Sequence, residues 1–298
     1  MTGTVARPNP VKGFLRLVMI EHSIFALPFA YLAALTAMRS LGTHVQWGTL
    51  GLITVAMVSA RTVAMAANRI IDVRIDAQNP RTANRELVTG AISMRVAWAG
   101  LLISLVIFFA SAAALNLLCL LLAPLALFAL VIYSYAKRFT NYPQVFLGAA
   151  QAVAPVGAWI GVTGAWSWEA LVLGLAVGTW IGGFDCIYAC QDVDIDRQIG
   201  VGSVPVKHGV AGALRIAAAT HVLTVALYAA FGYLTGYGWL WWLGLAGIAA
   251  VLVYEHRIVR PDDLSRVNRA FFTANGLIAV ALFAFALLDL VILQGLRA

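Results

Sequence analysis

Apolar stretches, each about as long as a membrane crossing, alternate with short polar segments along almost the whole chain. Their apolar residues run on without the period-two alternation of a membrane barrel. About 20 apolar residues in a helix span the bilayer core, and lipid offers no partners for backbone N–H and C=O groups. The pattern predicts an all-α, polytopic membrane bundle of nine transmembrane helices, at residues 14–38, 48–71, 93–115, 117–136, 143–163, 168–191, 211–234, 238–255 and 268–293.

The third and fourth spans nearly touch, because residues 96–136 form one apolar run that is too long for a single crossing. Asn116, with Pro124 eight residues later, marks the expected turn of a hairpin. No linker or low-complexity segment divides the chain, so residues 1–298 are expected to form a single domain.

Composition agrees with a lipid environment. The chain is 62% hydrophobic and 11% charged, whereas a soluble domain carries about 25% charged residues. Much of its surface must therefore face lipid. Three cysteines are too few for a disulfide framework, and the spacing of Cys186 and Cys190 favours packing over a metal or redox site.

The basic residues are distributed unequally between the two sides that these spans define. Two of them, Arg39 and Arg297, fall on one side, and Arg61 lies inside the second span. By the positive-inside rule, the N-terminus and the long loops are expected in the cytoplasm, at a bacterial-type inner membrane. The net charge of +7 is thus a topology signal, and no nucleic acid is expected as a partner. The other 17 of the 20 basic residues are Arg7, Lys12, Arg16, Arg69, Arg74, Arg81, Arg85, Arg95, Lys137, Arg138, Arg197, Lys207, Arg215, Arg257, Arg260, Arg266 and Arg269.

Two acidic motifs stand at the cytoplasmic ends of the second and sixth predicted spans, at residues 68–76 and 188–196. Spacing by four puts Asn68, Asp72 and Asp76 on one helix face. The same spacing aligns Tyr188, Asp192 and Asp196, and Asp185 joins that face, whereas Asp194 points away. Matched positions are offset by 120 residues, which suggests an internal duplication.

Stacked carboxylates repel one another and need a compensating charge. Hard oxygen ligands suit Mg²⁺, which binds one or two carboxylates together with phosphate oxygens and waters. Two such clusters facing each other would hold two or three Mg²⁺ around a diphosphate. The alternative, helix-end aspartates facing water, accounts poorly for two copies on one membrane side.

Cations follow each acidic motif, and guanidinium groups fit phosphate oxygens in a bidentate way. The candidates for binding a diphosphate are Arg81, Arg85, Lys137, Arg138 and Lys207. Each one, taken singly, is equally well explained as a positive-inside anchor.

Ionisable residues inside the bilayer are costly and usually functional. Arg61 lies seven residues before Asn68, two turns deeper on the same face. Glu21 and His22 lie about two turns into the first span. A structural intramembrane pair is the alternative for these last two residues.

These motifs resemble the UbiA superfamily of intramembrane aromatic prenyltransferases. Residues 68–76 read as its NxxxDxxxD, residues 185–196 as its DxxYxxxDxxxD, and the stretches 81–90 and 135–148 are also similar. Within the superfamily, residues 21–28 and 183–188 look most like the 4-hydroxybenzoate polyprenyltransferase-like branch. Part of that branch prenylates 1,4-dihydroxy-6-naphthoate in menaquinone synthesis.

The resemblance implies helices around a central cavity, Mg²⁺ dependence and an all-trans polyprenyl diphosphate donor. It implies that Lys137 touches the diphosphate and that Asp185 and Tyr188 lie near the reacting carbon. The residues it assigns to the metal–diphosphate site are Asn68, Asp72, Asp76, Asp192 and Asp196.

The hypothesis that follows is prenyl transfer to an aromatic acid in ubiquinone or menaquinone biosynthesis. The ring attacks the prenyl C1 through the carbon ortho to its hydroxyl, with Asp185 as candidate base or cation stabiliser. Arg61 or His22 is the candidate for holding the acceptor's carboxylate. The cavity must be dry, because water would quench an allylic cation.

Other functions remain possible at this point. A secondary transporter also has repeats and intramembrane charge, although its acidic residues are more naturally expected at the midplane. A CDP-alcohol phosphotransferase is acidic and Mg²⁺-dependent, but its D-G-x-x-A-R pattern is absent. Haem farnesyltransferases and chlorophyll synthases share the UbiA-type motifs, and only an acceptor assay separates them.

Overall fold

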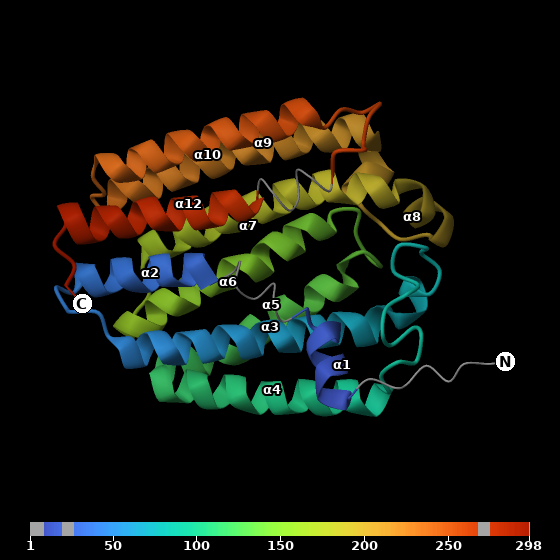
Figure 1. Cartoon of the computed structure of the whole chain (residues 1–298), viewed down its shortest axis with the longest axis horizontal. Coiled ribbons are helices and arrows are strands. Elements are labelled where there is room, and N and C mark those ends of the chain that lie inside the picture. The colour runs from blue at the N-terminus through green and yellow to red at the C-terminus, as the bar shows by residue number, and fades with distance from the viewer. Residues whose placement is uncertain (1–8, 20–26, 268–274, 298) are drawn as a thin grey trace.

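A computed structural model describes residues 9–19, 27–267 and 275–297 of the chain as a bundle of roughly parallel helices (Figure 1). The described part contains no strand, and one isolated bridge joins Arg260 to Asp263. The helices are α1 (Pro10–Leu17), α2 (Leu27–Ser40), α3 (Trp47–Asp76), α4 (Met94–Leu115), α5 (Leu117–Ala136), α6 (Pro143–Thr163), α7 (Trp168–Tyr188), the 3₁₀ turn η2 (Ala189–Asp192), α8 (Val193–Ile199), α9 (Val204–Leu234), α10 (Trp239–Ile258), α12 (Asn275–Leu288) and the π-helix η4 (Asp289–Leu293).

Eight described helices are long and apolar enough to cross a membrane. They match the second to ninth predicted spans. Large apolar side chains stand exposed on them, for example Val106 at 68% and Leu121 at 65%. Such surface is stable only against lipid, so the all-α membrane architecture is confirmed.

The first predicted span is not one continuous helix. Residues 14–17 belong to α1, which ends at Leu17, and Met19 adopts a left-handed backbone with φ of 49°. The next described helix, α2, begins at Leu27. Hydropathy hid this break because the residues at which α1 ends, Val18 and Met19, are themselves apolar.

The predicted hairpin at Asn116 is confirmed. This residue is the only one between α4 and α5, and its extended backbone reverses the chain. Its side chain caps α5 by accepting a hydrogen bond from the Cys119 N–H at 2.9 Å, and it donates one to the Ile160 carbonyl at 2.8 Å. A partly buried amide with partners on both sides satisfies backbone groups of the turn.

Helices α6 and α7 approach each other unusually closely. A Cβ on Gly148 would lie 2.5 Å from the Gly178 carbonyl oxygen, and a Cβ on Gly178 would lie 2.6 Å from the Gly148 carbonyl oxygen. One turn further along, Gly182 faces the Gln144 carbonyl. Small residues allow such backbone contact in membranes, and here they set the position of α7, which carries Asp185.

The two ends of the bundle differ in chemistry. The loop of residues 77–93 and helix α8 lie at one end, on the right of Figure 1, which we call the acidic end because Asp76 and Asp192 are there. The chain's last described residues and the turn after α2 lie at the other, the opposite end. At 30 residues, α3 is about 45 Å long, so it extends past a bilayer core of about 30 Å at the acidic end.

Candidate active site

The first acidic motif ends a helix that runs without interruption through Asp76. The Asn68 amide donates a hydrogen bond to Asp72 Oδ2 at 3.1 Å, which confirms that these residues share a face. Asp72 is only 2% exposed. Two cations at the end of α5 bind it: Lys137 Nζ lies 2.6 Å from Oδ2, and an Arg138 terminal nitrogen lies 2.8 Å from Oδ1.

Asp76, one turn later, is also buried and has a different cation. A terminal nitrogen of Arg85 donates to both carboxylate oxygens at 2.6 Å. The Thr82 hydroxyl donates to the Asp76 backbone carbonyl at 3.0 Å, which holds the loop against the end of α3. The loop therefore folds back over the helix that precedes it.

The second acidic motif has a different local structure. Helix α7 ends at Tyr188, a 3₁₀ turn covers Ala189–Asp192, and α8 begins at Val193. The expectation of one regular helix through residues 185–196 is therefore wrong. A 3₁₀ turn rotates successive side chains further than an α-helix does, which changes how they line up. Asp194 is exposed and pairs with Arg197 at 3.6 Å, as expected for a residue that points away.

Arg81 binds both Tyr188 and Asp192. Its Nε and a terminal nitrogen donate to the two Asp192 oxygens at 3.0 and 2.6 Å, and its other terminal nitrogen donates to the Tyr188 hydroxyl at 3.3 Å. Burial pulls the pKa of the Arg81 guanidinium down, but its hydrogen bonds to Asp192 and that carboxylate's charge outweigh burial and raise the pKa. Arg81 is therefore a permanent cation between the motifs.

The two motifs form one site. Asn79 and Arg81, from the loop after the first motif, both bind Asp192 of the second. Lys137, which binds Asp72, also interacts electrostatically with Asp196. A backbone hydrogen bond also links the end of α5 to the loop after α8, because the Gly202 N–H donates to the Lys137 carbonyl at 2.7 Å.

Several polar residues of the site were not anticipated from the sequence. The Asn79 amide donates to Asp192 at 3.2 Å, and Gln144, itself 4% exposed, hydrogen-bonds Asp185. Ser203 hydrogen-bonds Asp196, and Tyr133 interacts electrostatically with both Asp185 and Asp72. A polar residue in the first turn of an apolar span, such as Gln144, was the one available signal.

Two predicted site residues, Lys207 and Arg61, stand apart from this network, and a third lies outside the described residues. Lys207 is exposed and lies 4.6 Å from the centre of the Tyr142 ring, so its contact with a diphosphate stays a prediction. Arg61 is partly buried in α3, and its Nε has no hydrogen-bond partner among the described residues. His22 lies outside the described residues, as does Glu21.

The donor atoms of the site suit a hard divalent cation. Its candidate ligands are carboxylate oxygens and the Asn68 amide oxygen, with no sulfur among them. In the part of the chain that the structure describes, no three acidic, His or Cys side chains form a metal cluster by themselves. Mg²⁺ is bound in proteins by one or two carboxylates with substrate phosphates and waters, so the arrangement fits a metal that arrives with a phosphate ligand.

Comparison with known proteins identifies the family. The model of the UbiA prenyltransferase family matches residues 26–287. Two curated relatives are 4-hydroxybenzoate octaprenyltransferases. That of Chromohalobacter salexigens is 33% identical over 80% of this chain and 81% of its own, and that of Paraburkholderia phytofirmans is 30% identical over 89% and 92%. The chain therefore belongs to the UbiA prenyltransferase family.

Solved structures agree. The apo structure of a UbiA homolog from Aeropyrum pernix K1 is 37% identical, with a TM-score of 0.82 over 91% of this chain and 98% of that one. A UbiA homolog from Archaeoglobus fulgidus bound to DMAPP and Mg²⁺ is 20% identical, with a TM-score of 0.70 over 94% and 99%. The second likeness supports the fold.

Proposed function

We propose that this chain is a Mg²⁺-dependent aromatic prenyltransferase that moves a polyprenyl group from its diphosphate onto a hydroxylated aromatic acid. The observation that carries the proposal is the meeting of the two acidic motifs, with four cations, at one end of a lipid-facing bundle. The curated relatives named above carry that activity in their names. The family match favours an enzyme over a transporter.

The charge of the site supports metal dependence. Four cations, Arg81, Arg85, Lys137 and Arg138, stand against five carboxylates, Asp72, Asp76, Asp185, Asp192 and Asp196. A diphosphate adds further negative charge, so these residues alone would repel it. Divalent cations held by Asn68 and the four motif aspartates would correct this imbalance, and bound Mg²⁺ would supply Lewis-acid stabilisation of the leaving diphosphate.

The cations at the site would bind the diphosphate directly. Lys137 and Arg138 reach the first motif from α5, and Arg81 reaches the second from the loop. Each now neutralises a carboxylate, and each can shift part of its hydrogen bonding to phosphate oxygens when metal takes over that carboxylate. Arg binds phosphate in a bidentate way, whereas Lys acts as a compact point charge.

The transfer step exchanges one bond for another. The bond between the prenyl C1 and the diphosphate oxygen breaks, the ring carbon ortho to the hydroxyl bonds to C1, and the ring proton leaves to a base. Asp185, oriented by Gln144, is our candidate for that base or for stabilising positive charge at C1, with Tyr188 beside it. Arg61, whose Nε lacks a partner among the described residues, would hold the acceptor's carboxylate, with His22 as the second candidate.

The membrane setting supports the same chemistry. Apolar helices keep water from an allylic cation, and a polyprenyl tail can extend between helices into lipid. The distribution of Lys and Arg supports a cytoplasmic acidic end in a bacterial-type inner membrane, where a soluble aromatic acid and the diphosphate product are both accessible.

A membrane assay tests the proposal. Vesicles containing the protein are incubated with a labelled polyprenyl diphosphate, Mg²⁺ and either 4-hydroxybenzoate or 1,4-dihydroxy-6-naphthoate, and the products are identified by mass spectrometry. We expect prenylated acid and released diphosphate, and no product when the metal is chelated. Diphosphate release without any prenylated acid, or transfer that continues in excess chelator, would contradict the proposal.

A further inference from the structure

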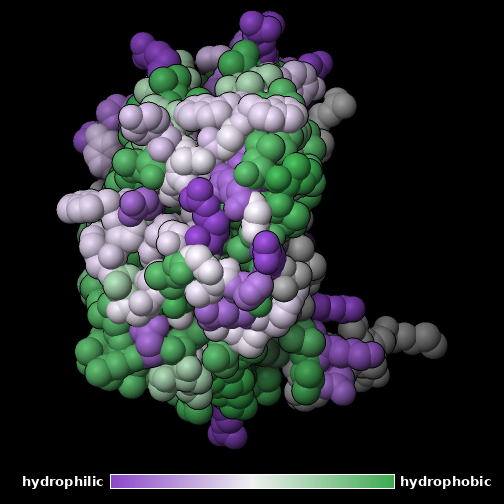
Figure 2. Space-filling model, turned by 90° about the vertical axis from the view of Figure 1, so that its left-hand side faces the viewer, coloured by the Kyte–Doolittle hydropathy of each residue, from purple (hydrophilic) through white to green (hydrophobic). Residues whose placement is uncertain are grey.

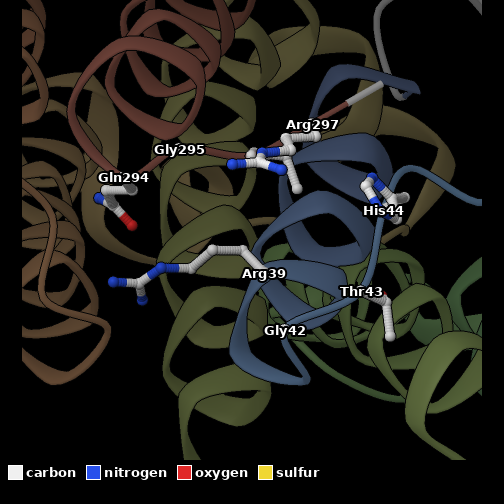
Figure 3. A pocket seen from close by; sticks show the side chains of 8 residues that line it. Arg39, Gly42, Thr43, His44, Gln294, Gly295 and Arg297 are labelled. Atoms are coloured by element: carbon white, nitrogen blue, oxygen red, sulfur yellow. The ribbon is translucent and has the colours of Figure 1, made fainter.

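A pocket of about 240 Å³ lies at the opposite end of the bundle, away from both acidic motifs. It is lined by residues of the segment 39–44, at the end of α2 and the turn after it, and by residues 294–297. In Figure 3, Gln294 and the guanidinium ends of Arg39 and Arg297 lie to the left of His44 and Thr43. Nothing in the proposed reaction uses this pocket.

Both arginines that the sequence places on this side of the membrane line the pocket. Arg39 and Arg297 are far apart in the chain, and the remaining basic residues belong to the acidic end or to the inside of a span. Arginines on this side oppose the orientation that the positive-inside rule favours. Their convergence on one cavity therefore points to a function for their charge.

The two guanidinium groups retain donors for a ligand. Arg39 donates one hydrogen bond, from a terminal nitrogen to the Thr235 carbonyl at 2.7 Å. Within residues 9–19, 27–267 and 275–297, neither Arg39 nor Arg297 forms an ion pair with a carboxylate. Two cations facing one cavity favour an anion, and phosphate is the anion whose geometry a guanidinium fits best.

The carboxylate next to the pocket belongs to Asp289, and its oxygens already accept hydrogen bonds from other groups of the protein. Asp289 is fully buried and accepts hydrogen bonds from the Gly238 and Trp241 N–H groups at the start of α10, at 2.9 and 3.1 Å. It also accepts one from the Gln294 amide at 2.6 Å. This bond orients the Gln294 side chain and leaves its Oε1 buried, with no hydrogen-bond partner among the described residues. The pocket thus offers a buried acceptor beside its two cations.

The surroundings place the pocket at the level of lipid headgroups. Trp47, Trp168 and Trp239 stand 69, 69 and 63% exposed at this end of the bundle, and such aromatic residues gather at the interface between headgroups and hydrocarbon. Leu41 and Ile292, exposed at 53 and 65%, border the lining segments. Figure 2 looks onto this end and shows strongly hydrophilic residues near the middle of the face, with residues of intermediate hydropathy around them and apolar residues to the right and below.

We propose that this pocket binds the headgroup of an anionic phospholipid from the leaflet at the opposite end, of the phosphatidylglycerol type. Arg39 and Arg297 bind the phosphate oxygens, and Gln294 Oε1 accepts a hydrogen bond from a headgroup hydroxyl. The acyl chains lie along the apolar surface that includes Leu41 and Ile292. The lipid joins the end of α2 to the C-terminal segment, at a distance from the acidic end.

Native mass spectrometry of the purified, delipidated protein tests this proposal. The protein is titrated with phosphatidylglycerol, with zwitterionic phosphatidylcholine and with soluble glycerol 3-phosphate. We expect one phosphatidylglycerol to bind about tenfold more tightly than phosphatidylcholine. We expect Arg297→Glu to weaken that binding by about tenfold or more, as for the loss of one charge-assisted contact, and Arg297→Lys to keep most of it.

Arg257→Glu is the matched control, because it makes the same charge change on an exposed residue at the end of α10 near the acidic end. Equal losses in Arg297→Glu and Arg257→Glu would show a non-specific charge effect and overturn the proposal. Glycerol 3-phosphate that binds as tightly as phosphatidylglycerol would show that the pocket takes a soluble anion instead. If Arg297→Glu unfolds during purification, a matched loss of phosphatidylglycerol selectivity in Gln294→Leu decides the matter, and unchanged selectivity there would contradict it.

Discussion

The ends of α3 and α7 carry aspartates at the same spacing, but they hold these aspartates in different ways. Asp72 stands on an unbroken helix, is 2% exposed and is clamped by two cations from the end of another helix, α5. Asp192 ends a 3₁₀ turn, its side chain is 13% exposed, and its cation is Arg81, from a loop. The repeat in sequence is therefore not a repeat in local structure.

This difference separates a fixed half of the site from an adjustable half. Helix ends joined by ion pairs to a buried carboxylate open rarely, whereas loops with exposed contacts belong to the least stable parts of a protein. The Arg81 side chain is 40% exposed, against 26% for Lys137. We therefore expect the first motif to keep its geometry without substrate and the second to adjust when a metal–diphosphate complex binds.

The largest effect is expected from Asp72→Ala and Asp192→Ala, which separate catalysis from stability. Both should reduce transfer by about a thousandfold or more, because each removes oxygen ligands from the site. Asp72→Ala should also cost about 2 kcal/mol of unfolding free energy, because it removes the buried carboxylate that pairs with Lys137 and Arg138, whereas Asp192→Ala should cost about 1 kcal/mol or less. Turnover in vesicles and thermal unfolding measure the two quantities. Equal stability losses would contradict the division into a fixed and an adjustable half.

Arg81→Gln should have the next largest effect, because Arg81 is the cation that joins the second motif to the loop of the first. We expect transfer to fall by about a hundredfold at low prenyl diphosphate, with little change in melting temperature, as for a charge-assisted contact on an exposed group. Arg81→Lys should recover only part of the activity, because a single ammonium cannot replace the bidentate contact with Asp192. Arg74→Gln, an exposed change on α3, is the control. The link is refuted if both Gln variants behave alike.

Gly178→Leu tests whether α7 must lie against α6 for the second motif to work. The new side chain meets the Gly148 carbonyl, and we expect a stability loss of about 1–3 kcal/mol. Transfer should fall by about tenfold in folded protein, because Asp185 moves relative to Gln144 on α6. Gly157→Ala, also on α6 but with open space around its Cβ position, should change neither quantity. Normal kinetics in folded Gly178→Leu would show that this contact serves stability alone.

The smallest effect is expected from Asn79→Ala, which removes one neutral donor from Asp192 while Arg81 remains. We expect a two- to fivefold loss of turnover, which corresponds to about 1 kcal/mol or less, the usual value of one such hydrogen bond. Asp194→Asn, at an 85% exposed side chain, should leave turnover unchanged. Steady-state rates in the same vesicles compare the two. A larger loss in Asp194→Asn would mean that the exposed aspartate, not the motif position, matters for the reaction.

Local regularity explains which structural predictions succeed. Eight spans, the hairpin at Asn116 and the face shared by Asn68 and Asp72 follow from hydropathy and helical spacing. The end of α1 at Leu17 and the 3₁₀ turn before α8 do not, because apolar residues follow Leu17 and the polar residues of the 3₁₀ turn keep the spacing of a regular helix. The left-handed backbone at Met19 follows a contact between distant segments, the hydrogen bond from Arg69 to the Leu17 carbonyl.

The residues of the candidate site also differ in how readily the sequence reveals them. Its charged residues are visible in sequence because charge at a membrane edge is costly and stands out. Other site residues are inconspicuous in the sequence, namely Asn79, Gln144 and Tyr133. An amide or a phenol near the end of an apolar span is common, and only its contacts in the folded protein show that it belongs to the site. Lys207 is the opposite case: its charge is conspicuous in the sequence after the second motif, but its side chain lies over the Tyr142 ring and outside the network of the site.

By itself, the sequence determined that this chain is helical, crosses a membrane repeatedly and carries two aspartate rows on one side. These properties depend on period, length and charge, which act within single helices and against the solvent. Only the tertiary structure decided that Arg81 belongs to Asp192, that Lys137 belongs to Asp72 and that Arg39 meets Arg297 at one pocket. Such pairings depend on how helices distant in the chain pack side by side, and the packing of small residues such as Gly148 on Gly178 sets that arrangement without any sign in hydropathy or charge.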